Sequence, residues 1–209
     1  MSAETAEQRD FKFKVVLLGE GCVGKSSLVL RFVENKFSPR HLSTIQASFQ
    51  SKVVKVDDCR ADLNIWDTAG QEKYHALGPI YYRGSNGVLL VYDITDRRSF
   101  DKVKNWVLEI KTCLGKTAEI LIIGNKIDLE EDRQVTRQEA ESYAETEETL
   151  YMETSAQENR GITEAFEALT EKMIEHARTS VAEAPSVNRS IRLIEDDEEE
   201  NRRNKKCCR

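Results

Sequence analysis

The clearest chemical pattern in the sequence is a short run near its start that combines glycines with a lysine and a serine. It fits the pattern G-x-x-x-x-G-K-[ST] and reads Gly19-Glu20-Gly21-Cys22-Val23-Gly24-Lys25-Ser26. In this pattern the glycines let the backbone turn tightly so that its N–H groups face a phosphate, and the dipole of the following helix adds to the attraction. Lys25 then reaches the β- and γ-phosphates of a nucleotide, while the Ser26 hydroxyl is a ligand for Mg²⁺. The run predicts a phosphate-binding loop (P-loop), with Ser27 as the next residue of the site.

The residues on either side of this loop have the expected secondary-structure patterns. Residues 11–18 alternate and then close in an apolar run, which is typical of a strand that enters the centre of a sheet. Residues 25–34 are expected to form a helix with Leu28 and Phe32 on one face. Because a strand precedes the loop, a glycine-rich turn without a ligand is the weaker interpretation.

A second motif, Asp67-Thr68-Ala69-Gly70-Gln71, follows a predicted β-hairpin of residues 45–56 and 61–66. In an open α/β sheet, ligands bind at the carboxyl ends of the strands, where this motif lies. An acidic side chain beside a P-loop is the expected partner of Mg²⁺, which is the role we assign to Asp67. Gly70 lets the backbone approach a phosphate.

The identity of the base is indicated by Asn125-Lys126-Ile127-Asp128, which follows a predicted buried strand. The Asp128 carboxylate can accept hydrogen bonds from both the N1–H and the exocyclic amine of guanine, whereas adenine offers no such pair of donors. The wrong base would leave buried polar groups unpaired. The three motifs, in this order, predict a site that selects GTP over ATP.

The rest of the chain alternates strands and helices, which is typical of an α/β fold with a mostly parallel sheet. The expected elements are a loop at 72–86, strands at 87–92, 120–123 and 150–153, and helices at 99–114, after a capping box at 136–139, and at about 162–177. Phe166, Leu169 and Met173 of the last helix should face the core. We therefore predict a disordered N-terminus (1–10), one domain (11–178) and a disordered tail (179–209).

Composition and charge exclude several classes of protein. The 209 residues are 39% hydrophobic and 33% charged, which is ordinary for a soluble domain. The net charge of −6 argues against non-specific nucleic-acid binding, which relies on Lys and Arg to neutralise phosphates. We find no apolar run near the ~18 residues of a membrane span, no signal-peptide core and no second-position glycine for myristoylation. The five cysteines have neither disulfide nor zinc spacing, so we expect a reduced protein that faces the cytosol.

Several stretches resemble the Rab family of Ras-superfamily small GTPases. They read TIQASF at 44–49, AGQEKY at 69–74, YYRG at 81–84 and LVYDIT at 90–95. The resemblance covers roughly residues 11–177 and the terminal cysteines, and the early-endosomal branch, Rab subfamily twenty-one, is the most similar. It implies the P-loop NTPase fold, a mostly parallel six-stranded sheet with one antiparallel strand and helices on both faces. It also implies a GTPase with a slow intrinsic rate.

The resemblance implies a role for each matching position. Phe37 would pack against the guanine ring, and Ser155 and Ala156 would support the base. Gly70 would contact the γ-phosphate, and Gln71, the one catalytic residue, would hold the attacking water. The implied Mg²⁺ ligands are Ser26, Thr44 and Asp67. The implied effector and switch residues are His41, Ile45, Phe49, Trp66, Tyr74 and Tyr81.

Two positions depart from the family pattern. The usual S-A-K reads Ser155-Ala156-Gln157, so a shorter, neutral amide replaces the lysine stem that packs beside the base. This difference predicts weaker nucleotide retention. Lys73-Tyr74 replaces the commoner Arg-Phe, which keeps the charge and the ring but weakens any inference about effector contacts.

The tail has an acidic block at 195–200, basic residues at 202–206 and the ending Cys207-Cys208-Arg209. The two cysteines are either exposed thiols or sites of prenylation. The resemblance implies that both are geranylgeranylated, and two chains would give stable anchoring where one would not. Because one residue follows them, the ending is not a C-a-a-X box.

The resemblance also implies partners and a location. The partners are an exchange factor, a GTPase-activating protein (GAP), effectors, a GDP-dissociation inhibitor and a Rab escort protein, on a monomer that binds no nucleic acid. The location is the cytoplasmic face of early endosomes or endocytic vesicles, with Golgi or phagosome as alternatives and a cytosolic inhibitor-bound pool. Two other classes stay open: a P-loop nucleoside kinase, which would share only the first motif, and a non-hydrolysing GTP-dependent scaffold, against which Gln71 and Thr44 count.

Overall fold

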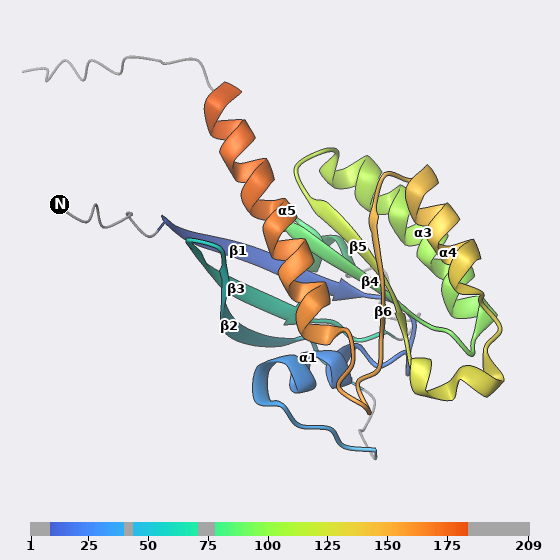
Figure 1. Cartoon of the computed structure of the whole chain (residues 1–209). Coiled ribbons are helices and arrows are strands. Elements are labelled where there is room, and N and C mark those ends of the chain that lie inside the picture. Colours follow the sequence, from blue (N-terminus) through green and yellow to red (C-terminus); the bar gives the residue numbers. More distant parts are fainter. Residues whose placement is uncertain (1–8, 40–43, 71–77, 184–209) are drawn as a thin grey trace, which may run out of the picture.

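A computed structural model of the chain describes residues 9–39, 44–70 and 78–183, which form a six-stranded sheet between two layers of helices (Figure 1). The strands are β1 (Arg9–Leu18), β2 (Ser48–Val56), β3 (Cys59–Asp67), β4 (Gly87–Asp93), β5 (Glu119–Asn125) and β6 (Leu150–Thr154). The helices are α1 (Lys25–Glu34), α2 (Gly78–Tyr82), α3 (Arg97–Leu114), the 3₁₀ segment η2 (Ile127–Asp132), α4 (Arg137–Thr146) and α5 (Ile162–Glu183).

The sheet has the order β2-β3-β1-β4-β5-β6. β1 pairs in parallel with both β3 and β4, and β5 pairs in parallel with β4 and β6. β2 is the exception, because it pairs antiparallel with β3 through the predicted hairpin. The predicted α/β fold, with a mostly parallel sheet and one antiparallel strand, is confirmed. The parallel strands bring their carboxyl ends to one edge of the sheet, so the residues that follow them share a single site.

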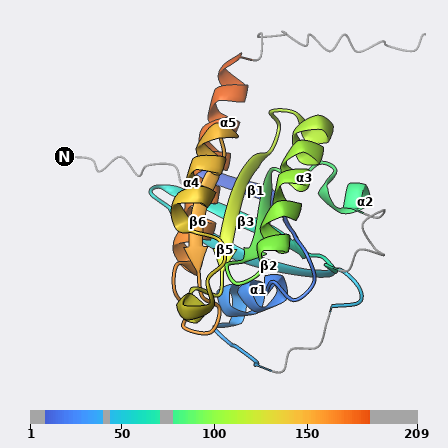
Figure 2. The ribbon, with the colours of Figure 1, turned by 90° about the vertical axis from the view of Figure 1, so that its right-hand side faces the viewer.

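The helices cover both faces of the sheet, and alternate residues of each strand face opposite layers. On one face, Val15 and Leu17 of β1 belong to a core that α1 and α5 cover. On the other face, Val16 and Leu18 belong to a core that α2, α3 and α4 cover. Figure 2 shows the sheet between these layers, with α3 apart from α5. Of the helices that the structure describes, none is long and apolar enough to cross a membrane.

Phe166 of α5 is central to the first core. Its ring stacks on that of Phe32 in α1 at a centroid distance of 3.8 Å, and 1% of the residue is exposed. We expect Phe166→Ala to lower the free energy of unfolding by about 3–5 kcal/mol, because the change removes buried surface and leaves a cavity. Urea unfolding at a fixed, saturating GDP concentration measures this loss. Leu108→Ala is the control, since Leu108 is 69% exposed and its loss should cost under about 0.5 kcal/mol. Equal losses in the two variants would contradict this description of the core.

The structure corrects several predicted boundaries. β1 begins at Arg9 rather than residue 11, because residues 9 and 10 pair with β3. α5 continues past the predicted end at residue 177, to Glu183, because no Gly or Pro interrupts its polar last turns. The predictions of disorder at 9–10 and at 179–183 are therefore wrong. β2 begins three residues later than predicted, and the expected loop at 72–86 contains α2.

Candidate nucleotide-binding site

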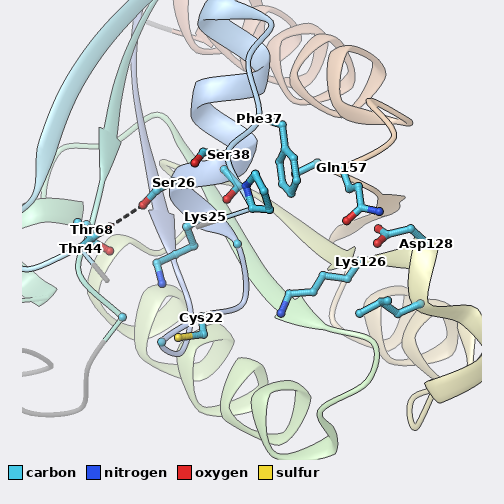
Figure 3. A pocket seen from close by; sticks show the side chains of 17 residues that line it. Cys22, Lys25, Ser26, Phe37, Ser38, Thr44, Thr68, Lys126, Asp128 and Gln157 are labelled. Carbon is cyan, nitrogen blue, oxygen red and sulfur yellow. Dashed lines mark hydrogen bonds between the residues drawn. The ribbon is translucent and has the colours of Figure 1, made fainter. Parts of the chain in front are cut away.

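A pocket of about 360 Å³ lies at the carboxyl edge of the sheet (Figure 3). Its lining comes from the P-loop, the segment after α1, the end of β3, the loop after β5 and the turn after β6. The lining residues are Gly21, Cys22, Gly24, Lys25, Ser26, Ser27, Phe37, Ser38, Pro39, Thr44, Thr68, Gly70, Lys126, Asp128, Leu129, Ala156 and Gln157. Figure 3 shows Ser26, Thr44 and Thr68 at one end and Phe37, Gln157 and Asp128 at the other. The three predicted motifs therefore meet in one cavity.

Lys25 lies in the first turn of α1 and is only 5% exposed. Its Nζ donates hydrogen bonds to the carbonyl oxygens of Gly19 and Glu20, each at 2.8 Å. Burial lowers the pKa of Lys25 to about 8, and the Coulomb attraction of Asp67 and Glu20 opposes this lowering. A phosphate group would oppose it in the same way, so this ammonium group is suited to an anionic ligand.

Two glycines make the phosphate end possible. Gly19 has φ +142°, and a Cβ there would lie 2.1 Å from the carbonyl oxygen of Val91. A Cβ on Gly70 would lie 2.3 Å from both the carbonyl oxygen of Glu20 and the Nζ of Lys25. Because a larger residue would collide with backbone at these places, glycine is required where the P-loop passes β4 and where the segment after β3 meets the P-loop.

Two hydroxyl groups meet at the phosphate end, and the Asp67 carboxylate is near enough to attract the charge of Lys25. The Oγ of Ser26 lies 2.6 Å from the Oγ1 of Thr44, and Asp67 is 3% exposed at the end of β3. The Thr68 hydroxyl donates to the carbonyl oxygen of Leu17 at 2.6 Å, which fixes this end of β3 against β1. Mg²⁺ prefers oxygen ligands at 2.0–2.1 Å, which places adjacent ligands about 3 Å apart. The Ser26 and Thr44 hydroxyls therefore fit Mg²⁺ after a small separation, and the buried carboxylate of Asp67 has the oxygen chemistry that this ion prefers.

The base end is held by side chains at the ends of β5 and β6 and in the segments directly after them. Asn125 Nδ2 donates to the carbonyl oxygen of Val23 at 2.8 Å, and Asn125 Oδ1 accepts from the Thr154 hydroxyl at 3.1 Å. The Ser155 hydroxyl donates to Asp128 Oδ1 at 2.5 Å. Asn125 thus ties the loop after β5 to the P-loop, while Ser155 orients the carboxylate predicted to read guanine.

Lys126 adopts a left-handed conformation with φ 68° and lines the middle of the pocket (Figure 3). Its Nζ lies 2.6 Å from Asp93 Oδ2. Asp93 is itself fixed, because its Oδ1 accepts from both the backbone N–H and the hydroxyl of Thr95. The sequence analysis missed Asp93 as a support for Lys126, although Asp93 directly follows a predicted strand, as Asp67 does.

Not every predicted site residue lines the pocket. Five predicted residues are not among its lining: Gly19, Val23, Asp67, Asn125 and Ser155. Gly19 and Ser155 bond to the lining residues Lys25 and Asp128, and Asn125 bonds to the carbonyl oxygen of Val23, which is 1% exposed. Asp67 attracts the charge of Lys25. Ser38, Pro39, Thr68 and Leu129 line the pocket and were not predicted. Only Thr68 could have been found from the sequence, because it belongs to the second motif. Gln71, His41, Tyr74, Cys207 and Cys208 lie outside the described residues.

Three of the predicted effector residues form an aromatic surface on β2, β3 and α2, which is exposed at Phe49 and half-buried at Trp66 and Tyr81. Phe49 meets Trp66 edge to face at a centroid distance of 5.5 Å, and Trp66 lies 6.4 Å from Tyr81. Phe49 is 54% exposed, and the nearby Ile45 is 68% exposed. Exposed apolar side chains that gather in this way are typical of a protein interaction site.

Gln157 is exposed at the rim of the base end, near Asp128 and Phe37 (Figure 3). We expect Gln157→Lys to slow GDP dissociation by roughly 3-fold, because a lysine stem would cover more of the base while its charge stays in water. Release of a fluorescent GDP analogue into excess GDP measures the rate. Gln138→Lys on the exposed surface of α4 is the control for added charge. A rate unchanged in Gln157→Lys would show that this position does not affect retention.

A buried P-loop lysine with two hydroxyls beside it, and a carboxylate at the other end of the pocket, form the arrangement expected of a guanine-nucleotide-binding NTPase. Comparison with known proteins agrees, since the Ras family model matches residues 14–175. Ras-related protein Rab-21 of Rattus norvegicus is 51% identical over 207 residues, covering 96% of this chain and 93% of that protein. Rab-21 of Homo sapiens is 51% identical, over 96% of this chain and 92% of that protein. Rab-21 of Dictyostelium discoideum is 48% identical, over 94% of this chain and 96% of that protein. The chain belongs to the Ras family and, within it, to the Rab-21 subfamily of small GTPases.

Membership of this family determines the enzymatic activity of the chain. The chain is a GTP hydrolase of membrane traffic, of a family that uses Mg²⁺ with GTP and works with exchange factors, GAPs and effectors. The nucleoside-kinase and non-hydrolysing alternatives are therefore set aside.

Proposed function

We propose that this chain is a switch that recruits effectors to endosomal membranes while GTP is bound. The observation that supports this most is the 2.6 Å contact between Ser26 of α1 and Thr44. Thr44 directly precedes Ile45, and Phe49 begins the aromatic surface a few residues later. The metal site and the effector surface thus share one short segment, so a change at the γ-phosphate would move the residues that an effector contacts.

In this proposal each end of the pocket binds one part of GTP. The P-loop amides and Lys25 bind the phosphates, and Ser26, Thr44 and Asp67 hold Mg²⁺. Bound Mg²⁺ neutralises charge that develops on the β- and γ-phosphates. At the other end Phe37 and Ala156 pack around the base, and Asp128 accepts its two donors.

Hydrolysis is an in-line displacement at the γ-phosphorus. The water oxygen forms a bond to phosphorus while the bond to the β–γ bridging oxygen breaks, which gives GDP and phosphate. Gln71 orients that water, and Lys25 stabilises the charge on the transferred group. A GAP supplies a further positive charge in trans, worth roughly 10³–10⁵ in rate in related GTPases. The slow intrinsic rate sets how long the GTP form lasts.

The membrane part of the proposal is carried by Cys207 and Cys208. We propose that a Rab escort protein presents both for geranylgeranylation, that the two chains anchor the protein to endosomes, and that a GDP-dissociation inhibitor extracts the GDP form. This follows the resemblance to Rab proteins and the doubled cysteines behind basic residues.

The test follows the fluorescently tagged full chain in cells with early-endosome and Golgi markers. The wild type and Gln71→Leu should coincide with the endosome marker, and Cys207→Ser/Cys208→Ser should be diffuse. Cys113→Ser is the matched control, because Cys113 is an exposed cysteine on α3, and it should behave as wild type. A double variant that still pellets with membranes would refute the lipid anchor, and coincidence with the Golgi marker alone would refute the endosomal assignment.

A further inference from the structure

Arg31, in the last turn of α1, contacts the turn after β6, the end of its own helix and the Phe37 ring. Its Nε donates to the carbonyl oxygen of Ala156 at 3.0 Å, and its Nη2 donates to that of Gln157 at 3.2 Å. Its Nη1 donates to the carbonyl oxygen of Asn35 at 3.1 Å. The guanidinium carbon also lies 5.8 Å from the centroid of the Phe37 ring.

These contacts join segments far apart in the sequence. Ala156 and Gln157 belong to the turn after β6, about 125 residues from Arg31, whereas Phe37 belongs to the segment directly after α1. All three line the pocket. The turn after β6 also has its own reciprocal backbone hydrogen bonds between Ser155 and Arg160, so it is a well-defined structure for Arg31 to bind. Arg31 thus connects the two sides of the base end.

α1 also carries Lys25 and Ser26 in its first turn. The first turn of this 10-residue helix therefore contributes to the phosphate end of the pocket, and its last turn contributes to the base end. Because a helix is rigid over this length, it sets the spacing between the two ends of a bound nucleotide. Through its contacts, Arg31 fixes the positions of residues 37 and 156–157 relative to this helix.

Arginine suits this place for two reasons. Its planar guanidinium has five N–H donors in a fixed geometry, so it can bind several carbonyl oxygens at once, whereas a lysine ammonium is a flexible point charge. A cation also interacts favourably with the carboxyl end of a helix, where Asn35 leaves α1. Arg31 is not among the residues that line the pocket, so it acts through the lining residues that it holds.

We propose that Arg31 is a positioning residue for the guanine base, which slows nucleotide dissociation by holding Phe37 and the Ala156–Gln157 backbone against α1. The proposal rests on the nucleotide site proposed above. It bears on this chain in particular, because Gln157 lacks the lysine stem that would otherwise cover the base. The hydrogen bonds from Arg31 to the backbone should then account for a larger share of nucleotide retention.

The test measures release of a fluorescent GDP analogue from the full chain with Mg²⁺ and excess GDP. Arg31→Ala should release it about 10-fold faster, as expected for the loss of charged hydrogen bonds. Arg31→Lys should lie between Arg31→Ala and the wild type. Single-turnover hydrolysis of GTP already bound should keep its wild-type rate in both variants, which a general loss of structure would not allow. Arg137→Ala is the control, since Arg137 is an exposed arginine paired with Glu141 on α4.

A double-mutant cycle measures how much of the effect of Arg31 depends on the Phe37 ring. If Arg31 acts partly through that ring, Arg31→Ala should accelerate release less in a Phe37→Leu background than in the wild type. Wild-type release in both Arg31 variants would overturn the inference, as would a parallel loss of the single-turnover rate. The Asp128→Asn variant, measured in the same experiment, tests the nucleotide site independently of Arg31. If Asp128→Asn changes the base preference while the Arg31 variants release GDP at the wild-type rate, the proposed site stands and only the role of Arg31 is refuted.

Discussion

Asp128→Asn should reverse the base preference of the site from guanine to xanthine. The Asp128 carboxylate accepts from two donors of guanine, whereas an asparagine amide has one acceptor and one set of donors. Xanthine has a carbonyl oxygen where guanine has its amine, so it suits the amide. We expect GTP affinity to fall by roughly 10²–10⁴-fold, since sites built to hydrogen-bond a ligand strongly reject a mismatched pair. Competition of GTP and XTP against a fluorescent GDP analogue measures the change.

The structure makes this substitution conservative in shape. The Ser155 hydroxyl donates to Asp128 Oδ1 at 2.5 Å, and an asparagine oxygen can accept the same hydrogen bond. Asp132→Asn is the matched control, because it is the same change at an exposed position of the same 3₁₀ segment, and it should leave the preference for GTP intact. Continued preference for GTP over XTP in Asp128→Asn would mean that this carboxylate does not read the base.

Gln71→Leu should hold the chain in its GTP form. Leucine has neither donor nor acceptor for the attacking water, and misplacement of a reacting group by about 1 Å can cost roughly 10²-fold in rate. We therefore expect single-turnover GTP hydrolysis to slow by about 10- to 100-fold and stimulation by a GAP to be lost. Phosphate release from GTP-loaded protein measures the rate.

GDP affinity should stay unchanged in Gln71→Leu, because the substitution does not alter the contacts with the base. Gln138→Leu, an exposed change on α4, should hydrolyse GTP as the wild type does. Hydrolysis in Gln71→Leu as fast as in the wild type would remove Gln71 from the mechanism.

The sequence predicted the centre of this site because each motif starts where a buried strand ends. Asp67 ends β3 and Asn125 ends β5, and the P-loop begins directly after β1. Parallel strands bring these ends to one edge, so local patterns were enough to place the three motifs together. The helix from Lys25 to Glu34 was predicted at its observed bounds for the same reason, since its apolar face and its preceding loop are both local signals.

What the sequence could not predict depends on contacts between distant segments. The roles of Asp93 and Arg31 rest on partners 33 and about 125 residues away. α2 is five residues long and has no apolar period to reveal it, and η2 is held partly by the contact between Arg133 and Glu153 of β6. Helix ends were missed where polar residues with good helix propensity extend a helix beyond its apolar stripe, as in the last turn of α5.

The most direct test of the central claim is displacement of a bound fluorescent GDP analogue from the wild-type chain by GTP and by ATP, with Mg²⁺ present. We expect GTP to displace the analogue at concentrations at which ATP does not, since Asp128 can accept from two donors that guanine has and adenine lacks. Displacement by ATP as effective as that by GTP would contradict it, because the pocket would then bind phosphates without reading the base.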